Sequence, residues 1–247
     1  MIQSMTGYGE ARESGISCEI KSLNHKGFVT NFIMPEYLQS LEVELRNLLH
    51  SRLKRGAISY RLIVEVSPKF EIDWHSAEEL IKLIFKLEKT FGLAGRLPPN
   101  FFYQNVIRTK YEFNEEIKKK IIELTEKAIE KLIEMRKREG QRIEKELEKE
   151  LKKLEGYLKE IEEKGGELRN KIDFSEECSR LRFHISGFRE LMKREEPCGH
   201  ALNFLLQEML REANTIAAKG QDAEISKNIV MIKEKIMQLK EHVENVL

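Results

Sequence analysis

The sequence predicts an α+β protein, in which a small strand-rich α/β domain precedes a C-terminal helical domain of long, coiled-coil-like helices. Three observations predict this class. Short segments rich in β-branched and aromatic residues occupy positions 1–34 and 59–66. From residue 114 onward, apolar residues instead recur every three or four positions, which is the period of a helix face. Charged residues, mostly lysine and glutamate, make up 34% of the chain, and this suits long solvated helices.

The first segment is predicted to form strands joined by turns. Residues 16–21 alternate between apolar and polar, and residues 28–34 are rich in strand-forming side chains, with glycines between them. Pro35 is expected to open a helix whose leucines, spaced by three and four, form one apolar face. Gly56 is expected to take the left-handed conformation that ends this helix.

A further strand and a second helix follow. The strand is predicted at 59–66, where β-branched and aromatic residues are frequent. Ser76 and Glu79 have the spacing of a capping box, which predicts a helix that runs to about Phe91. The proline-containing segment 92–100 is predicted to be a linker.

One continuous helix is predicted for residues 114–164, about 75 Å long at the usual rise per residue. Only Gly140 interrupts the pattern appreciably, and Gly165-Gly166 is expected to end the helix. The second half carries a coiled-coil seam, and such a seam requires a partner helix. The seam consists of Ile143, Leu147, Leu151, Leu154, Leu158 and Ile161.

Three more helices are predicted, the first from Ser175, the second at 200–219 and the third from about Asp222. Each has an apolar stripe, so a helical bundle is the expected packing. The large number of narrow apolar stripes on a chain of this size also favours self-association. The predicted division is an N-terminal α/β domain at 1–92, a linker and long helical arm at 93–170, and a C-terminal helical domain at 171–247.

Composition limits the possible functions. The formal net charge is only +1, so any RNA site requires local clustering of lysine and arginine. The three cysteines are far apart, which disfavours a disulfide framework or zinc site and favours a reducing compartment. The sequence shows no membrane-helix or signal-peptide pattern, so a cytoplasmic protein is expected. It also shows no P-loop or dinucleotide-binding motif, and no nucleotide cofactor is expected.

The helix predicted at 200–219 carries the strongest candidate for chemistry. Beside its apolar face, Glu208 and Glu212 lie one turn apart, where they can share a hard divalent cation or serve as acid and base. Arg211 and Lys219 lie on the same side and can hold phosphate oxygens. The alternative is a solvated helix face with surface ion pairs, which this spacing usually indicates.

Four other candidates are polar residues or segments. His184 flanks the apolar stripe of the preceding helix and is either a metal ligand or proton-transfer group, or an ordinary packed or surface histidine. Asn214 belongs to a second polar stripe on the following helix. Residues 21–27 form a basic turn and 52–56 a basic helix end. Both suit phosphate contacts, or simply a hairpin turn and a helix whose last cations complement its dipole.

Six segments occur in the order of a known family's motifs: Met1–Gly9, Glu19–Lys26, Arg52–Gly56, Arg138–Gly140, Arg180–His184 and Gln207–Thr215. Together they resemble the YicC/YloC family of bacterial proteins. The resemblance implies an endoribonuclease of bacterial RNA turnover that is assisted by a divalent cation, manganese or magnesium. It also implies a ring-like homo-oligomer, a hexamer that encloses RNA. Leu210 departs from the family pattern, which usually has Asn at this position.

The resemblance also implies which residues form the site. The implied catalytic residues are Glu208, Glu212, His184, Arg211 and Lys219, with Glu208 and Glu212 as metal ligands. The implied RNA contacts are Asn24, His25, Lys26, Arg52, Arg55 and Asn214. Two alternatives remain open: a non-catalytic oligomeric RNA-binding clamp or adaptor, and a coiled-coil scaffold. The scaffold predicts no salt-dependent affinity for RNA.

Overall fold

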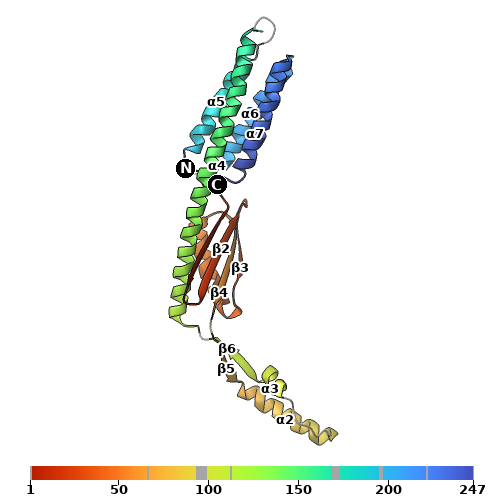
Figure 1. Ribbon diagram of the computed structural model, residues 1–247. Helices are drawn as coiled ribbons and strands as arrows, with labels where there is room; N and C mark the ends of the chain where they lie inside the picture. The colour runs from red at the N-terminus through yellow and green to blue at the C-terminus, as the bar shows by residue number, and fades with distance from the viewer. Residues whose placement is uncertain are drawn as a thin grey trace.

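The computed structural model describes residues 2–65, 67–92, 99–111, 113–167, 173–194, 197–220 and 222–246. It confirms the α+β class, with a mixed sheet in the N-terminal half and long helices in the C-terminal half. The molecule is elongated, and a helical bundle, the sheet and a smaller lobe follow one another along its length (Figure 1). The longest helix, α4 (Glu115–Glu167), runs beside the sheet and continues into the bundle.

The sheet has four strands in the order β1-β2-β4-β3. Strands β1 (Gly7–Glu13), β2 (Ile16–Leu23) and β4 (Gly56–Val64) are antiparallel neighbours, and β3 (Phe28–Ile33) lies parallel to β4. Parallel neighbours need a crossover connection. Here a 3-10 helix, η1 (Glu36–Leu41), and α1 (Glu42–Leu53) provide it.

One face of the sheet packs against α1 and the first half of α4. Its core residues are Ala11, Ile16, Cys18, Ile20, Ile58, Tyr60 and Leu62 from the strands, with Leu45, Leu49, Leu53, Ile121, Leu124, Ala128, Ile129 and Leu132 from the helices. Tyr60 is fully buried, and its hydroxyl lies 2.9 Å from the Thr125 hydroxyl of α4. A Cβ on Gly9 would lie 1.9 Å from the Ala128 carbonyl oxygen, so β1 and α4 are in direct backbone contact.

The second half of α4 forms a bundle with α5 (Ser175–Met192), α6 (Gly199–Lys219) and α7 (Ala223–Val243). The predicted seam of α4 is buried, and α7 of the same chain is its main partner. The stripe of α7 consists of Ile225, Ile229, Ile232, Ile236, Leu239 and Val243. Because the seam is covered within the chain, it gives no reason to expect self-association.

Helix α4 belongs to both hydrophobic cores. Its residues 121–132 face the sheet and 143–161 face the bundle. Between these stretches the N-terminal segment crosses the helix, and a Cβ on Gly140 would lie 2.0 Å from the Ile2 carbonyl oxygen. The three-part division of the chain remains a prediction, and the packing shows that α4 joins its parts.

The smaller lobe contains a two-stranded antiparallel sheet of β5 (Lys69–Ile72) and β6 (Ile107–Lys110), with α2 (Trp74–Phe91) and α3 (Pro99–Asn105). The predicted start of α2 is wrong. Asp73, rather than Ser76, is the capping residue, because its carboxylate accepts a hydrogen bond from the Ser76 backbone N–H at 3.0 Å. Neither β5 nor α3 nor β6 was predicted from the sequence, since each is too short to show a period.

Two predicted glycine breaks also differ from the structure. After α1, Lys54 takes a positive φ of 47°, and Gly56 (φ 121°) already belongs to β4. Helix α4 continues through Gly165 and Gly166 to Glu167 instead of ending there. The Phe174 ring packs against the helix at Gly165, where a Cβ would lie 2.6 Å from the ring. Across the described parts of the chain, no helix is both long enough and apolar enough to span a membrane.

Candidate active site

A groove of about 630 Å³ runs between α5 and α6. Both helices turn their apolar faces into the bundle core, which leaves the polar residues beside those faces to meet along the groove. The lining residues are Glu176, Glu177, Ser179, Arg180, Phe183 and His184 from α5, and Glu208, Arg211, Glu212 and Thr215 from α6. Four of the predicted catalytic residues, Glu208, Arg211, Glu212 and His184, are therefore brought together.

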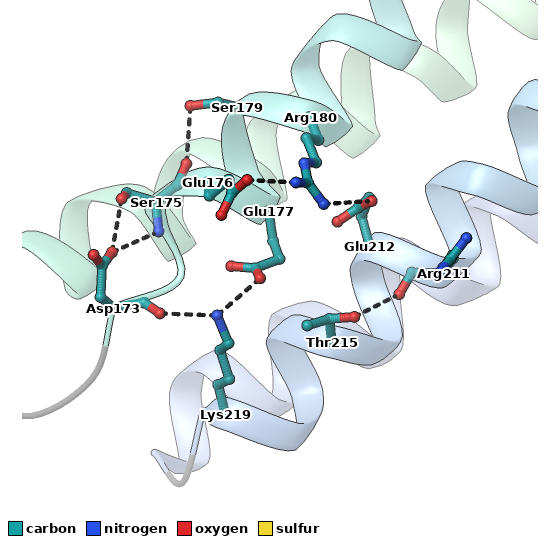
Figure 2. Close-up of polar contacts among 10 residues, drawn as sticks. All are labelled: Asp173, Ser175, Glu176, Glu177, Ser179, Arg180, Arg211, Glu212, Thr215 and Lys219. Carbon is teal, nitrogen blue, oxygen red and sulfur yellow. Dashed lines mark hydrogen bonds and ion pairs between the residues drawn. The ribbon is translucent and has the colours of Figure 1, made fainter.

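Glu212 is the most buried of the predicted site residues, with 6% relative exposure. The sequence analysis placed it on a polar stripe beside the core face. Its position relative to Met209 and Ile216 continues the spacing of three and four, so the helix turns it inward. Its Oε1 lies 3.8 Å from Nη1 of Arg180, and Arg180 also pairs with Glu176 (Figure 2). Arg180 thus lies between a buried and an exposed carboxylate.

Glu208 and Arg211 form the more open side of the groove. The Glu208 side chain is 28% exposed and the Arg211 side chain 77%. Glu208 Oε2 and Arg211 Nη1 are 3.9 Å apart, which makes a loose ion pair. Arg211 is therefore a cation that can reach an anion in the groove without breaking a close contact.

His184 lies one helical turn after Arg180 on α5. The residue is half-buried, and its Nδ1 is buried with no hydrogen-bond partner among the described residues. Imidazole is the side chain best suited to proton transfer near neutral pH. His184 is thus a proton-transfer candidate whose ring is not engaged at Nδ1.

Lys219 lies at the end of α6, beyond the residues that line the groove (Figure 2). Its Nζ is 2.8 Å from Oε1 of Glu177 and donates to the Asp173 carbonyl oxygen at 3.3 Å. The hydrogen bond between Lys219 and Glu177 raises the pKa of the lysine and lowers the pKa of the glutamate. Lys219 therefore joins the end of α6 to the start of α5, and its phosphate contact remains a prediction.

The predicted RNA contacts of the N-terminal half gather elsewhere, at the end of the sheet. Asn24, His25 and Lys26 are exposed in the loop between β2 and β3. Arg55 Nε donates to the His25 carbonyl oxygen at 3.3 Å, and Arg52 is exposed in the last turn of α1. We call these five residues the basic ridge.

The basic ridge is fixed by two contacts with helices. Asn24 Nδ2 donates to the carbonyl oxygen of Glu244, directly after α7. The buried Arg136 of α4 donates to the Arg55 carbonyl oxygen at 3.3 Å, and burial lowers the pKa of Arg136 to about 10. Asn214, the remaining predicted RNA contact, is exposed on α6 beside the groove.

The groove offers oxygen ligands for a cation, but few of them. Glu208 and Glu212 supply carboxylate oxygens, which Mg²⁺ and Mn²⁺ prefer. Among the described residues, no group of three or more His, Cys, Asp or Glu side chains could hold a metal ion. The donor chemistry fits a hard cation, and the missing ligands would have to come from water or substrate phosphate.

Sequence reasoning did not assign a site role to Arg180, Glu177 or Phe183. Arg180 had a usable signal, because it precedes His184 by one helical turn and so shares its face. Phe183 also had a recognisable signal in the sequence, since it is a large apolar residue outside the apolar stripe of α5. The contact of Glu177 with Lys219 had none, because 42 residues separate them in the chain.

Comparison with known proteins covers the whole chain. Residues 2–145 match the family model "Endoribonuclease YicC-like, N-terminal region", and residues 129–247 match "Endoribonuclease YicC-like, C-terminal". The chain belongs to the YicC-like endoribonuclease family. The basic ridge lies in the part matched by the N-terminal model, and the groove lies in the part matched by the C-terminal model.

Two curated relatives align with this family member over their full length. The chain is 23% identical over 292 residues to the "Probable endoribonuclease YicC" of Clostridioides difficile (strain 630). It is 25% identical over 286 residues to the protein of the same name from Haemophilus influenzae. Each alignment covers 100% of both chains. Both alignments are longer than the 247 residues of this chain, so both relatives contain segments that it lacks.

Proposed function

We propose that this chain is an endoribonuclease and that it cleaves RNA in the groove between α5 and α6. One observation carries the proposal. A single groove, in the part matched by the C-terminal family model, gathers two arginines, four carboxylates and an imidazole. Cleavage of a phosphodiester requires cations that hold the phosphate and groups that move a proton, and the groove contains both.

The exposures of these side chains suggest their roles. Arg211 is the most exposed cation of the groove and is the first candidate to bind the scissile phosphate. His184 is the candidate for proton transfer, and the partly exposed Glu208 is the carboxylate that a substrate can reach. Glu212 is buried beside Arg180, so in the absence of a bound cation it positions that guanidinium.

A divalent cation, Mn²⁺ or Mg²⁺, is part of this proposal. Glu208 and Glu212 are the residues that would hold it, together with phosphate oxygens of the RNA. When bound, such a cation polarises the phosphate and stabilises the leaving oxygen. The Arg180 contact of Glu212 would have to loosen for that carboxylate to take part.

The basic ridge supports a second area of RNA contact, away from the groove. It gathers Lys26, Arg52 and Arg55 on a chain whose net charge is only +1, which is the local clustering that an RNA site requires. The family resemblance further implies that the chain forms a homo-oligomer, a hexamer. It also implies that this oligomer acts in bacterial RNA turnover in the cytoplasm.

The proposal is tested with Glu208→Gln, which keeps the size of the side chain and removes its charge. Purified wild type and variant are incubated with a labelled structured RNA in Mn²⁺, in Mg²⁺ and in EDTA. We expect metal-dependent cuts by wild type that disappear in the variant, while folding and RNA binding are retained. Glu163→Gln, at an exposed glutamate of α4 outside the groove, is the matched control and should cut like wild type.

Other outcomes change the proposal in defined ways. Full activity of Glu208→Gln would remove this groove as the site. Cleavage in EDTA that still depends on Glu208 would support the nuclease and exclude a role for the divalent cation. RNA binding by wild type without cleavage would indicate the clamp or adaptor. If RNA affinity is absent, or does not weaken as salt rises, the scaffold is indicated.

A further inference from the structure

Among the described residues, Phe183 is the one phenylalanine, tyrosine or tryptophan that lines the groove, and its exposure is 75%. It lies on α5 outside the stripe formed by Leu181, Ile185 and Phe188, each of which is fully buried. The bundle core is therefore complete without it. A phenylalanine this exposed covers little apolar surface of its own chain, so core packing does not explain its position.

The surroundings of Phe183 are polar and partly cationic. Arg180 and His184 flank it on α5, and Arg211 lines the groove from α6. The groove also contains four glutamates, and each of them pairs with Arg180, Arg211 or Lys219. The centroids of the Phe183 and His184 rings are 6.0 Å apart, and the rings are inclined by 66°, so each leaves a face free of the other. The Arg180 and Arg211 side chains are 55% and 77% exposed, which leaves both guanidinium groups accessible.

An exposed aromatic ring beside two exposed arginines matches the chemistry of a single-stranded nucleic acid. Each nucleotide has a flat apolar base and an anionic phosphate, and proteins bind such strands by stacking bases on aromatic rings beside basic groups. In a duplex, the base faces are already covered by neighbouring base pairs. An aromatic ring in the groove therefore discriminates between an unpaired base and a paired one.

We propose that Phe183 is a stacking platform for one unpaired base of RNA, so that the groove takes single-stranded RNA in preference to duplex. This inference rests on the proposed function, because it names the substrate class of the same groove. If a base stacks on Phe183, the phosphate attached to that nucleotide would lie beside Arg180 and Arg211.

The test measures binding of two labelled RNAs by fluorescence anisotropy at one fixed salt concentration. The first is a 12-nucleotide oligouridylate and the second a blunt 12-base-pair duplex. The proteins are wild type, Phe183→Ala, Phe183→Tyr and Phe204→Ala. Phe204 is the matched control, since it lies on the neighbouring helix, is 60% exposed and is outside the groove lining.

We expect Phe183→Ala to bind the oligouridylate roughly 5- to 100-fold more weakly, the range for loss of one stacked base. Its affinity for the duplex and its melting temperature should match wild type, because the side chain covers no core. Phe183→Tyr keeps an aromatic ring and should bind the single strand like wild type, and so should Phe204→Ala.

Three results would overturn the inference. If Phe183→Ala binds the oligouridylate as tightly as wild type, and wild type cleaves RNA, Phe183 is not a stacking platform. The nuclease proposal then remains intact. Equal weakening toward both RNAs, with a changed oligomeric state by light scattering, would make Phe183 a contact between copies. Failure of wild type to bind or cleave any RNA would contradict the proposed function itself. The wild-type protein alone decides this outcome, so it is distinguishable from a failure of the stacking inference.

Discussion

Arg180 of α5 and Glu212 of α6 form an ion pair across the groove, with 3.8 Å between Nη1 and Oε1. The Glu212 side chain is only 8% exposed, whereas that of Arg180 is 55% exposed. The pair therefore links a carboxylate held inside the bundle to a cation that solvent can reach. Through it, the packing of α6 fixes the position of the Arg180 guanidinium on α5.

We expect Arg180→Gln to lower RNA cleavage by roughly tenfold or more, because it removes a cation that, on our proposal, binds phosphate in the groove. The measurement is the initial rate of cleavage, with circular dichroism to show that the fold is kept. Glu176→Gln is the control, since it removes the exposed partner of Arg180 and leaves the contact with Glu212. Equal rates for Arg180→Gln and wild type would exclude Arg180 from the site.

The ion pair of Lys219 and Glu177 should make stability depend on acid. The hydrogen bond from Lys219 lowers the pKa of Glu177, whose ordinary value is 4.5. Such a carboxylate stabilises the fold above its ordinary pKa, and the contribution is lost as the pH falls below it. We expect Lys219→Met to melt a few degrees below wild type at pH 7, and the two to converge in acid.

Melting temperatures measured from pH 7 to pH 3 test this prediction. Lys227→Met, at an exposed lysine of α7, is the control and should follow the wild-type curve. A constant difference between Lys219→Met and wild type at every pH would show that Glu177 is not the partner responsible.

Two glycines of α4 should respond to alanine in opposite ways. At Gly140 a Cβ would lie 2.0 Å from the Ile2 carbonyl oxygen, whereas at Gly156 no described atom lies within 4 Å. We expect Gly140→Ala to destabilise the protein by roughly 1–3 kcal/mol, because the backbones must move apart. Gly156→Ala should stabilise it by about 0.5–1 kcal/mol, since alanine is the better helix former. Urea unfolding measures both, and stabilisation by Gly140→Ala would contradict the close contact.

The three cysteines should be unreactive in the folded protein. Cys18, Cys178 and Cys198 are all buried, and burial raises the pKa of each thiol, that of Cys178 to about 12. Because the thiolate is the reactive form, we expect a disulfide reagent at pH 8 to label none of them. All three should react in guanidinium. Rapid labelling of the native protein would show that one of these sites opens easily.

Much of the helical fold follows from the sequence because apolar spacing is a direct record of burial. The seam from Ile143 to Ile161 and the stripe of α7 are both buried as predicted. The prediction could not tell that these two seams cover each other, since pairing depends on the whole chain. The start of α2 was misplaced because Asp73 and Ser76 are both good capping residues, and spacing alone does not choose between them.

The candidate site was only partly accessible from sequence. Glu208, Arg211 and Glu212 lie on one helix, so their common side is a matter of helix geometry. His184 was predicted as well, but its place in the same groove depends on the packing of α5 against α6. Glu212 was misplaced on a polar stripe because its charge suggested solvent, although its spacing from Met209 and Ile216 pointed inward. That the basic ridge lies away from the groove depends on tertiary structure alone.

The sharing of α4 between two cores means that this protein cannot be cut into independent modules. A fragment that begins at residue 173 would contain the whole groove, yet its apolar stripes would lose the wall that Leu147, Leu151, Leu154 and Leu158 provide. A fragment that ends before α4 would lose the helix against which Tyr60 and Ile20 are buried. We therefore expect the two halves to fold and unfold together, because each needs α4 to complete its core.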